Sequence, residues 1–183
     1  RILMPSACAA LYRRQLVEQI GFFDESFFAY CEDSDLGLRA RIAGWDARLA
    51  ANAVVYHKYS ATAGSFSPFK LYLVERNHFW AVLKNFPPIF LLLLPLTTLL
   101  RYVFQALVIL RGTGSGKMIQ QTSDAKACMF AVLGGLWHGL RNPFPIIAKR
   151  HVFFKRCHAG SDRLSRLILK HRMSFSELLD ARD

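Results

Sequence analysis

An acidic cluster is the part of this 183-residue sequence whose residue types could do chemistry. Glu32, Asp33 and Asp35 place three carboxylates within four positions, at a predicted junction between a loop and a helix. The partial positive charge of a helix N-terminus keeps a nearby carboxylate ionised. A general base must be ionised and must lie within hydrogen-bonding reach of the proton that it takes. Asp33 is therefore a candidate general base.

The same cluster also has a purely structural interpretation. Asp33 or Ser34 would cap the helix that follows, and Asp35 would form an ion pair with Arg39 four residues later. For Asp35 we expect the structural role. For Asp33 the residue types alone leave both roles open.

Sequence patterns predict that alternating helices and short strands position the acidic cluster. A helix over 12–20 ends at Gly21, and a second helix, which starts at the acidic cluster, ends at Gly44. Ser67-Pro68 supplies an N-cap and a proline at the first helical position for a long helix that runs to Pro87-Pro88. Short strands are expected at 7–11, 47–50 and 54–57. This order predicts an α/β fold class.

Composition divides the chain into two regions. Hydrophobic residues make up 52% and charged residues 20%, which excludes a disordered protein. Nearly all of the net charge of +11 lies after the prolines, so we predict a near-neutral region over 1–86 and a basic, apolar region over 87–183. The four cysteines have no C-x-x-C spacing, which argues against a disulfide framework or a structural zinc site.

The second region is predicted to be helical and directed to a membrane. Residues 89–110 are long enough to cross a bilayer at about 1.5 Å per residue, but Arg101 lies near the middle, where a charge is costly. A spanning, a re-entrant and an interfacial helix all fit this segment. Residues 149–156 alternate basic pairs with aromatic residues, which suits either anionic headgroups or packing against the rest of the protein.

The stretch Gly21–Arg39 resembles the G-G-F-D-E-x-F-F-x-Y-x-E-D-x-D-L-x-x-R signature of family 2 glycosyltransferases. The resemblance to rhamnosyl- and galactofuranosyl-transferase-like members continues at Gly44-Trp45, at 53–57 and at Arg76-Asn77, and it covers 1–86. It implies the C-terminal half of a GT-A nucleotide-sugar transferase domain, an α/β fold, followed by a membrane-associated helical extension. The family's nucleotide-binding half, with its D-x-D metal motif, does not occur in this sequence, and Phe22 replaces a common glycine.

The resemblance also implies roles for single residues. Asp33 would be the general base of an inverting transfer, and Glu32 would position the acceptor. His57 would join the D-x-D motif in holding a divalent cation, Mg²⁺ or Mn²⁺. Arg76 and Asn77 would lie near the substrate, although Arg76 could equally pair with a nearby acid.

Two further groups of residues have open interpretations. Arg13 could bind a diphosphate, because guanidinium groups suit phosphate oxygens. The aromatic residues of 22–30 are expected mainly as core, with a sugar-stacking surface as the alternative.

We therefore predict an inverting glycosyltransferase that moves a sugar from a nucleotide-sugar donor to a glycan acceptor, lipid-linked, in bacterial cell-surface polysaccharide synthesis. The basic, apolar tail predicts contact with an anionic membrane surface, at the cytoplasmic face of the inner membrane. A membrane-binding module without activity is the alternative. Nucleic-acid binding is a weaker alternative, because the sequence contains no recognisable nucleic-acid motif.

Overall fold

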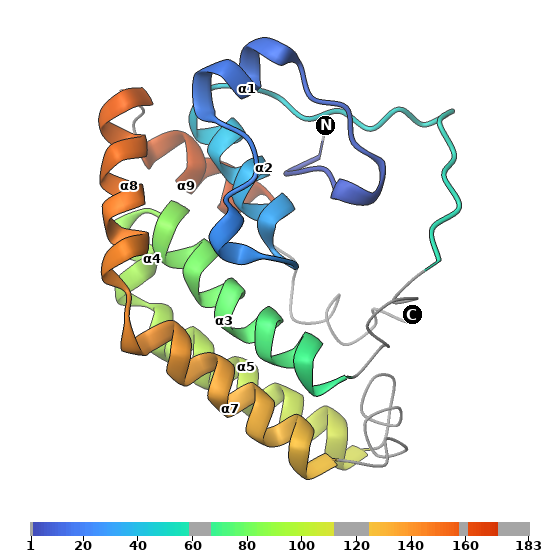
Figure 1. The fold of residues 1–183 in the computed structure, drawn as a ribbon, viewed down its shortest axis with the longest axis vertical. Helices are drawn as coiled ribbons and strands as arrows, with labels where there is room; N and C mark the ends of the chain where they lie inside the picture. Colours follow the sequence, from blue (N-terminus) through green and yellow to red (C-terminus); the bar gives the residue numbers. More distant parts are fainter. Residues whose placement is uncertain (1, 59–66, 112–124, 158–160, 172–183) are drawn as a thin grey trace.

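The computed structural model describes residues 2–58, 67–111, 125–157 and 161–171 (Figure 1). Within these ranges the regular elements are all helices. In chain order they are η1 (Ala7–Ala9), α1 (Arg14–Ile20), η2 (Glu25–Phe27), α2 (Glu32–Ile42), α3 (Pro68–Asn85), α4 (Pro88–Leu92), α5 (Leu94–Arg111), α7 (Ala125–Arg141), α8 (Phe144–Cys157) and α9 (Ser161–Lys170).

The predicted α/β class is wrong for the described residues, because they contain no β-strand. A single antiparallel bridge joins Ile2 to Ala47. The expected half of a GT-A domain is wrong for the same reason. Residues 7–9 form η1 instead of a strand end, and neither 47–50 nor 54–57 forms a strand. Strands need neighbouring strands and a buried face to be stable, and the described chain provides 54–57 with neither, since Val54, Val55 and Tyr56 are all exposed.

Local sequence signals correctly predict the end of α1 and both ends of α3. α1 ends at Gly21, whose φ of 77° favours glycine. α3 begins after Ser67, whose hydroxyl accepts a hydrogen bond from the backbone N–H of Lys70, and Pro68 is its first residue. α3 ends at Asn85, directly before the double proline.

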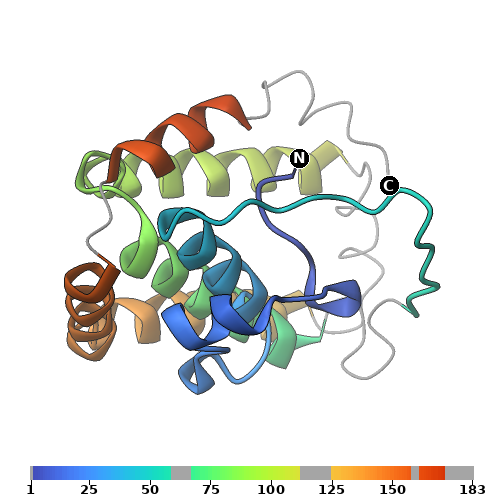
Figure 2. The ribbon, with the colours of Figure 1, turned by 90° about the horizontal axis from the view of Figure 1, so that it is seen from above.

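α2 forms the centre of the molecule together with α3 (Figures 1 and 2). Its charged residue Asp35 is fully buried and accepts hydrogen bonds from Arg39 at 2.8 Å, Lys84 at 3.0 Å and Asn85 at 2.9 Å. The predicted pair of Asp35 with Arg39 is confirmed. Because Lys84 and Asn85 belong to α3, this ion cluster joins the two helices at their buried ends.

A second buried acid, Asp24, ties the loop before α2 to α3 and α8. Its carboxylate accepts hydrogen bonds from Lys84 at 2.7 Å and from Lys149 at 2.6 Å. Burial alone would raise the pKa of Asp24, but the hydrogen bonds from Lys149 and Lys84 outweigh it and hold the pKa well below its usual value.

α3 and α7 run in the same direction and approach each other through glycines of α7. A Cβ at Gly135 would lie 3.0 Å from the Cβ of Glu75, and one at Gly139 would lie 3.2 Å from the ring of Phe79. The small residues therefore let the two backbones pack closely. No local sequence signal predicted the role of these glycines.

α8 packs against the end of α3 and uses its basic residues there. Arg150 donates hydrogen bonds to the backbone carbonyls of Leu83, Lys84 and Phe86, which lie at the C-terminus of α3 and would otherwise lack partners. Phe153 of α8 is buried. Of the two interpretations of 149–156, the one in which the segment packs against the protein is thus supported.

α5 carries Arg101 in its apolar sequence because an acid lies opposite. The guanidinium of Arg101 donates two hydrogen bonds, of 2.7 and 2.6 Å, to the buried carboxylate of Glu75 on α3, which also accepts one from the Tyr102 hydroxyl. The leucine-rich side of the helix points away from this pair. We name the exposed side chains of this side the α5 apolar face: Leu96, Leu99, Leu100, Val103 and Leu107. Within the described residues, no helix combines the length and the apolar character that crossing a membrane requires.

Candidate active site

Asp33 lies half-buried in the first turn of α2, where the N-terminal segment crosses the helix. Its Oδ2 accepts a hydrogen bond from the backbone N–H of Ala7 at 3.1 Å, and its Oδ1 accepts one from the N–H of Ser34 at 2.7 Å. The crossing is close because Gly37 has no side chain: a Cβ there would lie 2.5 Å from the Cβ of Met4. The fold thus fixes the Asp33 carboxylate, which has no cationic partner among the described residues.

The expected capping role of Asp33 or Ser34 is wrong. Cys31 occupies the N-cap position of α2, and its side chain makes no capping hydrogen bond. α2 begins at Glu32, two residues earlier than a cap at Asp33 would require, so that Asp33 lies inside the first turn. A carboxylate in this position still gains from the partial positive charge of the helix N-terminus.

The loop before Asp33 has an unusual backbone. Phe28, Tyr30 and Cys31 have φ values of 63°, 68° and 64°. These values lie in the left-handed region, which is unfavourable for residues other than glycine. Each such residue costs on the order of 1 kcal/mol or more, and it persists only where surrounding contacts hold it. The site therefore needs a device that keeps this loop in place.

Asn77 of α3 is that device. Its side-chain amide is fully buried and donates to the backbone carbonyls of Phe27, Ala29 and Tyr30 at 2.8, 2.7 and 2.8 Å. One side chain thus satisfies three carbonyls of the strained loop. The structure places Asn77 behind the loop, so it acts on Asp33 through the loop backbone.

Arg76 supports the same loop from the adjacent position. Its Nε donates to the Asn77 side-chain oxygen at 2.9 Å, and its terminal nitrogen donates to the carbonyl of Phe27 at 3.1 Å. Its guanidinium lies 4.5 Å from the ring centroid of Trp80, a cation–π distance. Among the described residues Arg76 forms no ion pair, so the alternative that it pairs with an acid is not supported.

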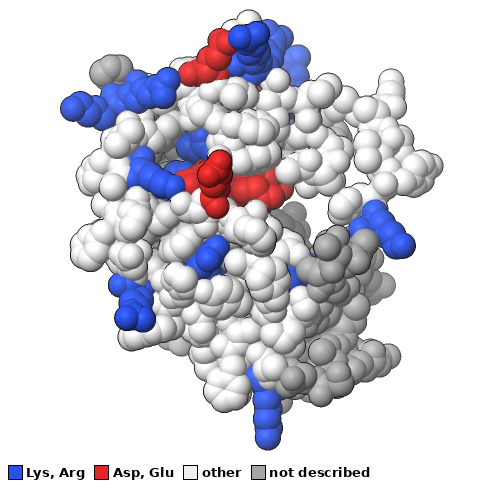
Figure 3. Space-filling view, viewed as in Figure 1, with Lys and Arg blue, Asp and Glu red and all other residues white. Residues whose placement is uncertain are grey.

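The acidic cluster affects the protonation of its neighbours. Burial, together with the charge of Asp33, raises the pKa of Glu32. Burial and then the charges of Asp33 and Glu32 raise the pKa of Tyr12, and the same causes with Glu75 raise that of Cys31 to about 12. On the face of the molecule that Figure 3 shows, acidic atoms gather near the middle.

Two polar atoms of this cluster are buried without a hydrogen-bond partner among the described residues. They are the hydroxyl oxygen of Tyr12 and Oε2 of Glu32. Buried polar groups are normally hydrogen-bonded, so these two oxygens are exceptions within the described structure. Tyr12 was not recognised from the sequence, because it lies 20 residues before Glu32 and no local spacing links them.

The structure does not bring His57 into this site. Its side chain is exposed, in the segment that follows α2. No group of three His, Cys, Asp or Glu side chains suited to a metal ion occurs in the described part of the chain. These residues do not fit a divalent-cation site, and the cation remains a prediction from the resemblance.

Arg13 forms no ion pair with any of the described residues. It is exposed at the N-cap of α1, while its neighbour Arg14 pairs with Glu18 at 2.8 Å. The expectation that the aromatic residues of 22–30 form core holds for only part of the group. Phe27 is completely buried, whereas Phe28 is 76% exposed and stands edge-on to Phe69, which is itself exposed.

Comparison with known proteins shows that the chain is similar to a glycosyltransferase. Two curated proteins from strains of Mycobacterium tuberculosis, both named N-acetylglucosaminyl-diphospho-decaprenol L-rhamnosyltransferase, are 34% identical over 84 aligned positions. These cover 41% of this chain and 27% of each relative, so the chain spans about a quarter of their length. No family model matches the chain. No solved structure matches it either.

Proposed function

We propose that this chain contributes the acceptor side of a glycosyltransferase in which Asp33 is the general base. The observation that carries the proposal is the placement of Asp33: the carboxylate is held by two backbone N–H groups, has no cationic partner among the described residues, and follows a strained loop that Asn77 stabilises. Such strain concentrates at functional sites. The similarity to a rhamnosyltransferase supports the same class of reaction.

The proposed step is a direct displacement. The Asp33 carboxylate takes the proton of an acceptor hydroxyl while the hydroxyl oxygen forms a bond to the anomeric carbon of the donor sugar. The bond between that carbon and the donor's phosphate oxygen breaks, and a nucleoside diphosphate leaves with the bonding electrons. Attack from the face opposite the leaving group inverts the anomeric centre. One base is sufficient, and no sugar becomes attached to the protein.

Glu32 and Tyr12 would position the acceptor beside Asp33. Both present a buried oxygen without a partner among the described residues. Burial, and then the charge of Asp33, raises the pKa of Glu32, so this carboxyl holds a proton more readily than an exposed glutamate does. Phe28 and Phe69 provide exposed aromatic rings next to this loop, on which a sugar ring could stack.

We propose a lipid-linked glycan as the acceptor, and action at the cytoplasmic face of a bacterial membrane. The name of the similar M. tuberculosis proteins contains a diphospho-decaprenol acceptor. The exposed leucines of α5 and a net charge of +11 suit contact with an anionic membrane surface. In this arrangement region 1–86 carries the chemistry and region 87–183 holds it near the lipid.

The decisive experiment replaces Asp33 by Asn in the intact protein. We expect sugar transfer to fall at least a hundredfold, since general-base catalysis contributes about 10²–10⁴-fold, while binding of the nucleotide sugar is retained. The matched control is Glu25→Gln, which neutralises an exposed acid eight residues earlier and should leave transfer unchanged. Full turnover by the Asp33→Asn variant would refute the assignment.

A membrane-contact module without activity is the second candidate. The observation that favours it is the α5 apolar face, whose exposed leucines no described element covers. It predicts vesicle binding that the Asp33→Asn variant retains, and no measurable transfer by the unsubstituted protein.

A further inference from the structure

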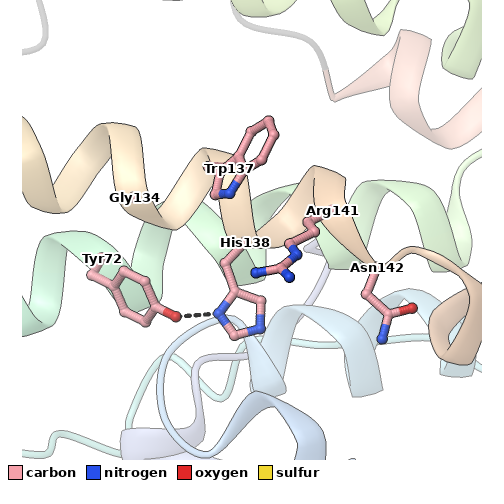
Figure 4. A pocket seen from close by; sticks show the side chains of 6 residues that line it. All are labelled: Tyr72, Gly134, Trp137, His138, Arg141 and Asn142. Atoms are coloured by element: carbon pink, nitrogen blue, oxygen red, sulfur yellow. Dashed lines mark hydrogen bonds between the residues drawn. The ribbon is translucent and has the colours of Figure 1, made fainter.

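A pocket of about 490 Å³ lies between α3 and the C-terminal half of α7 (Figure 4). Its lining residues belong neither to α2 nor to the loop before it, and no role was predicted for it. Its lining residues are Tyr72, Gly134, Trp137, His138, Arg141 and Asn142.

The inner wall of the pocket is fixed by contacts within the protein. The Tyr72 hydroxyl and Nδ1 of His138 are hydrogen-bonded, and the His138 ring also stands edge-on to Trp80. When the Tyr72 hydroxyl donates to Nδ1, the proton of the neutral imidazole is on Nε2, which is then a donor. Gly134 leaves the space beside Tyr72 open, since even a Cβ there would be 3.8 Å from the ring.

The polar groups of the pocket are mainly hydrogen-bond donors. Arg141 offers a guanidinium, Trp137 an indole N–H and Asn142 an amide N–H. No Asp or Glu lines the pocket, and Arg141 makes no ion pair within the described chain. Figure 4 shows the Arg141 side chain reaching toward His138. A set of donors around an unpaired guanidinium suits a ligand rich in acceptor oxygens and negative charge, above all a phosphate group.

The pocket borders an exposed apolar surface of α7. We name this surface the α7 apolar face; it consists of Met129, Phe130, Leu133, Trp137 and Leu140, all about half or more exposed. At 100° per residue these positions share one side of the helix, and Arg141 lies at its edge, one turn after Trp137. Tryptophan and arginine beside an apolar surface are typical of the level of lipid headgroups.

We infer that this pocket binds the phosphate group of a lipid whose apolar chain lies along the α7 apolar face. A membrane phospholipid and a polyprenyl diphosphate share this chemistry, a phosphate ester on an apolar chain. The inference deepens the proposed function and rests on it only for the choice between these two lipids.

The test measures flotation of the intact protein with phosphatidylcholine vesicles that contain a minor fraction of phosphatidic acid, polyprenyl diphosphate or oleate. Oleate supplies negative charge without phosphate. We expect Arg141→Gln to weaken binding to the two phosphate lipids about tenfold, the effect of losing a charge-assisted hydrogen bond, and to leave oleate vesicles nearly unaffected. Stronger binding to polyprenyl diphosphate than to phosphatidic acid identifies the acceptor as the ligand, whereas equal binding identifies membrane phospholipid.

Lys126→Gln is the matched control, because it removes the same charge from an exposed position on the same helix. Equal losses in the two variants, or no preference for phosphate over oleate, would overturn the inference in favour of general electrostatic attraction. So would the absence of vesicle binding. Both substitutions are at exposed positions, so we expect both variants to fold, and circular dichroism would check this.

The outcomes also separate this inference from the proposed function. If Arg141→Gln loses lipid binding while Asp33→Asn retains transfer, the pocket stands and the base assignment falls. If Asp33→Asn abolishes transfer while Arg141→Gln and Lys126→Gln bind lipid alike, the reverse holds.

Discussion

Asp33 and Asp35 are two positions apart, yet the fold gives them opposite surroundings. Asp35 is completely enclosed and receives hydrogen bonds from Arg39, Lys84 and Asn85. Asp33 is half-buried and receives hydrogen bonds from the backbone N–H groups of Ala7 and Ser34 and from the Ser34 hydroxyl. Sequence spacing predicted the role of Asp35, because its partner Arg39 is one helical turn away. It could not predict Ala7 as the partner of Asp33, because 26 residues separate them.

The role of Asn77 leads to a prediction at the same scale. Asn77→Asp keeps the shape of the side chain but replaces the amide donors by oxygens that repel three carbonyls. We expect the free energy of unfolding to fall by about 2–4 kcal/mol, since each lost buried hydrogen bond costs roughly 1 kcal/mol and the carbonyls lose their partners. Urea denaturation measures this, with Asn52→Asp at an exposed turn as the control. An unchanged denaturation midpoint would show that Asn77 does not hold the loop.

At the scale of elements, helices with local signals were predicted well and strands were not. α1 and α3 have a glycine or a Ser-Pro pair at their ends, and these act within a few residues. The expected strands at 47–50 and 54–57 depend on partner strands, which the described chain does not provide. The alternation of apolar and polar residues in a short segment does not show whether a neighbouring strand is present to pair with it.

Gly135 makes the tighter of the two glycine contacts between α7 and α3, and the neighbouring Gly134 provides the control. We expect Gly135→Ala to lower the free energy of unfolding by about 1–3 kcal/mol, because the added methyl group would collide with Tyr72 and Glu75. Gly134→Ala adds the same methyl group 3.8 Å from Tyr72 and should be neutral or slightly stabilising. Thermal unfolding of both variants tests this. Equal stability would mean that the two helices can separate without cost.

At the scale of the whole molecule, the basic and apolar residues of region 87–183 serve two purposes. Lys149 and Arg150 are used inside the protein, against Asp24 and the end of α3. The α5 and α7 apolar faces remain exposed among the described residues. The membrane-directed character of this region stays a prediction from composition, and composition could not separate residues that pack internally from residues that face outward.

This division predicts which leucines matter for membrane contact. Leu100→Glu and Leu133→Glu place a charge on the α5 and the α7 apolar face, and we expect each to weaken binding to anionic vesicles several-fold. Leu49→Glu makes the same change at a position that is 73% exposed in the segment after α2, and it should have little effect. Vesicle flotation of the three variants checks this. Equal weakening by all three would indicate that added charge alone, and not position, is responsible.

The bidentate pair of Arg101 with Glu75 determines how α5 is rotated about its own axis. Leucines on all sides of a helix would allow many nearly equivalent orientations, because apolar packing has little directional preference. A planar guanidinium opposite a carboxylate allows one. The ion pair on the inner side of α5 thus selects which leucines point outward. The orientation of the α5 apolar face is therefore set by two charged residues, Arg101 and Glu75.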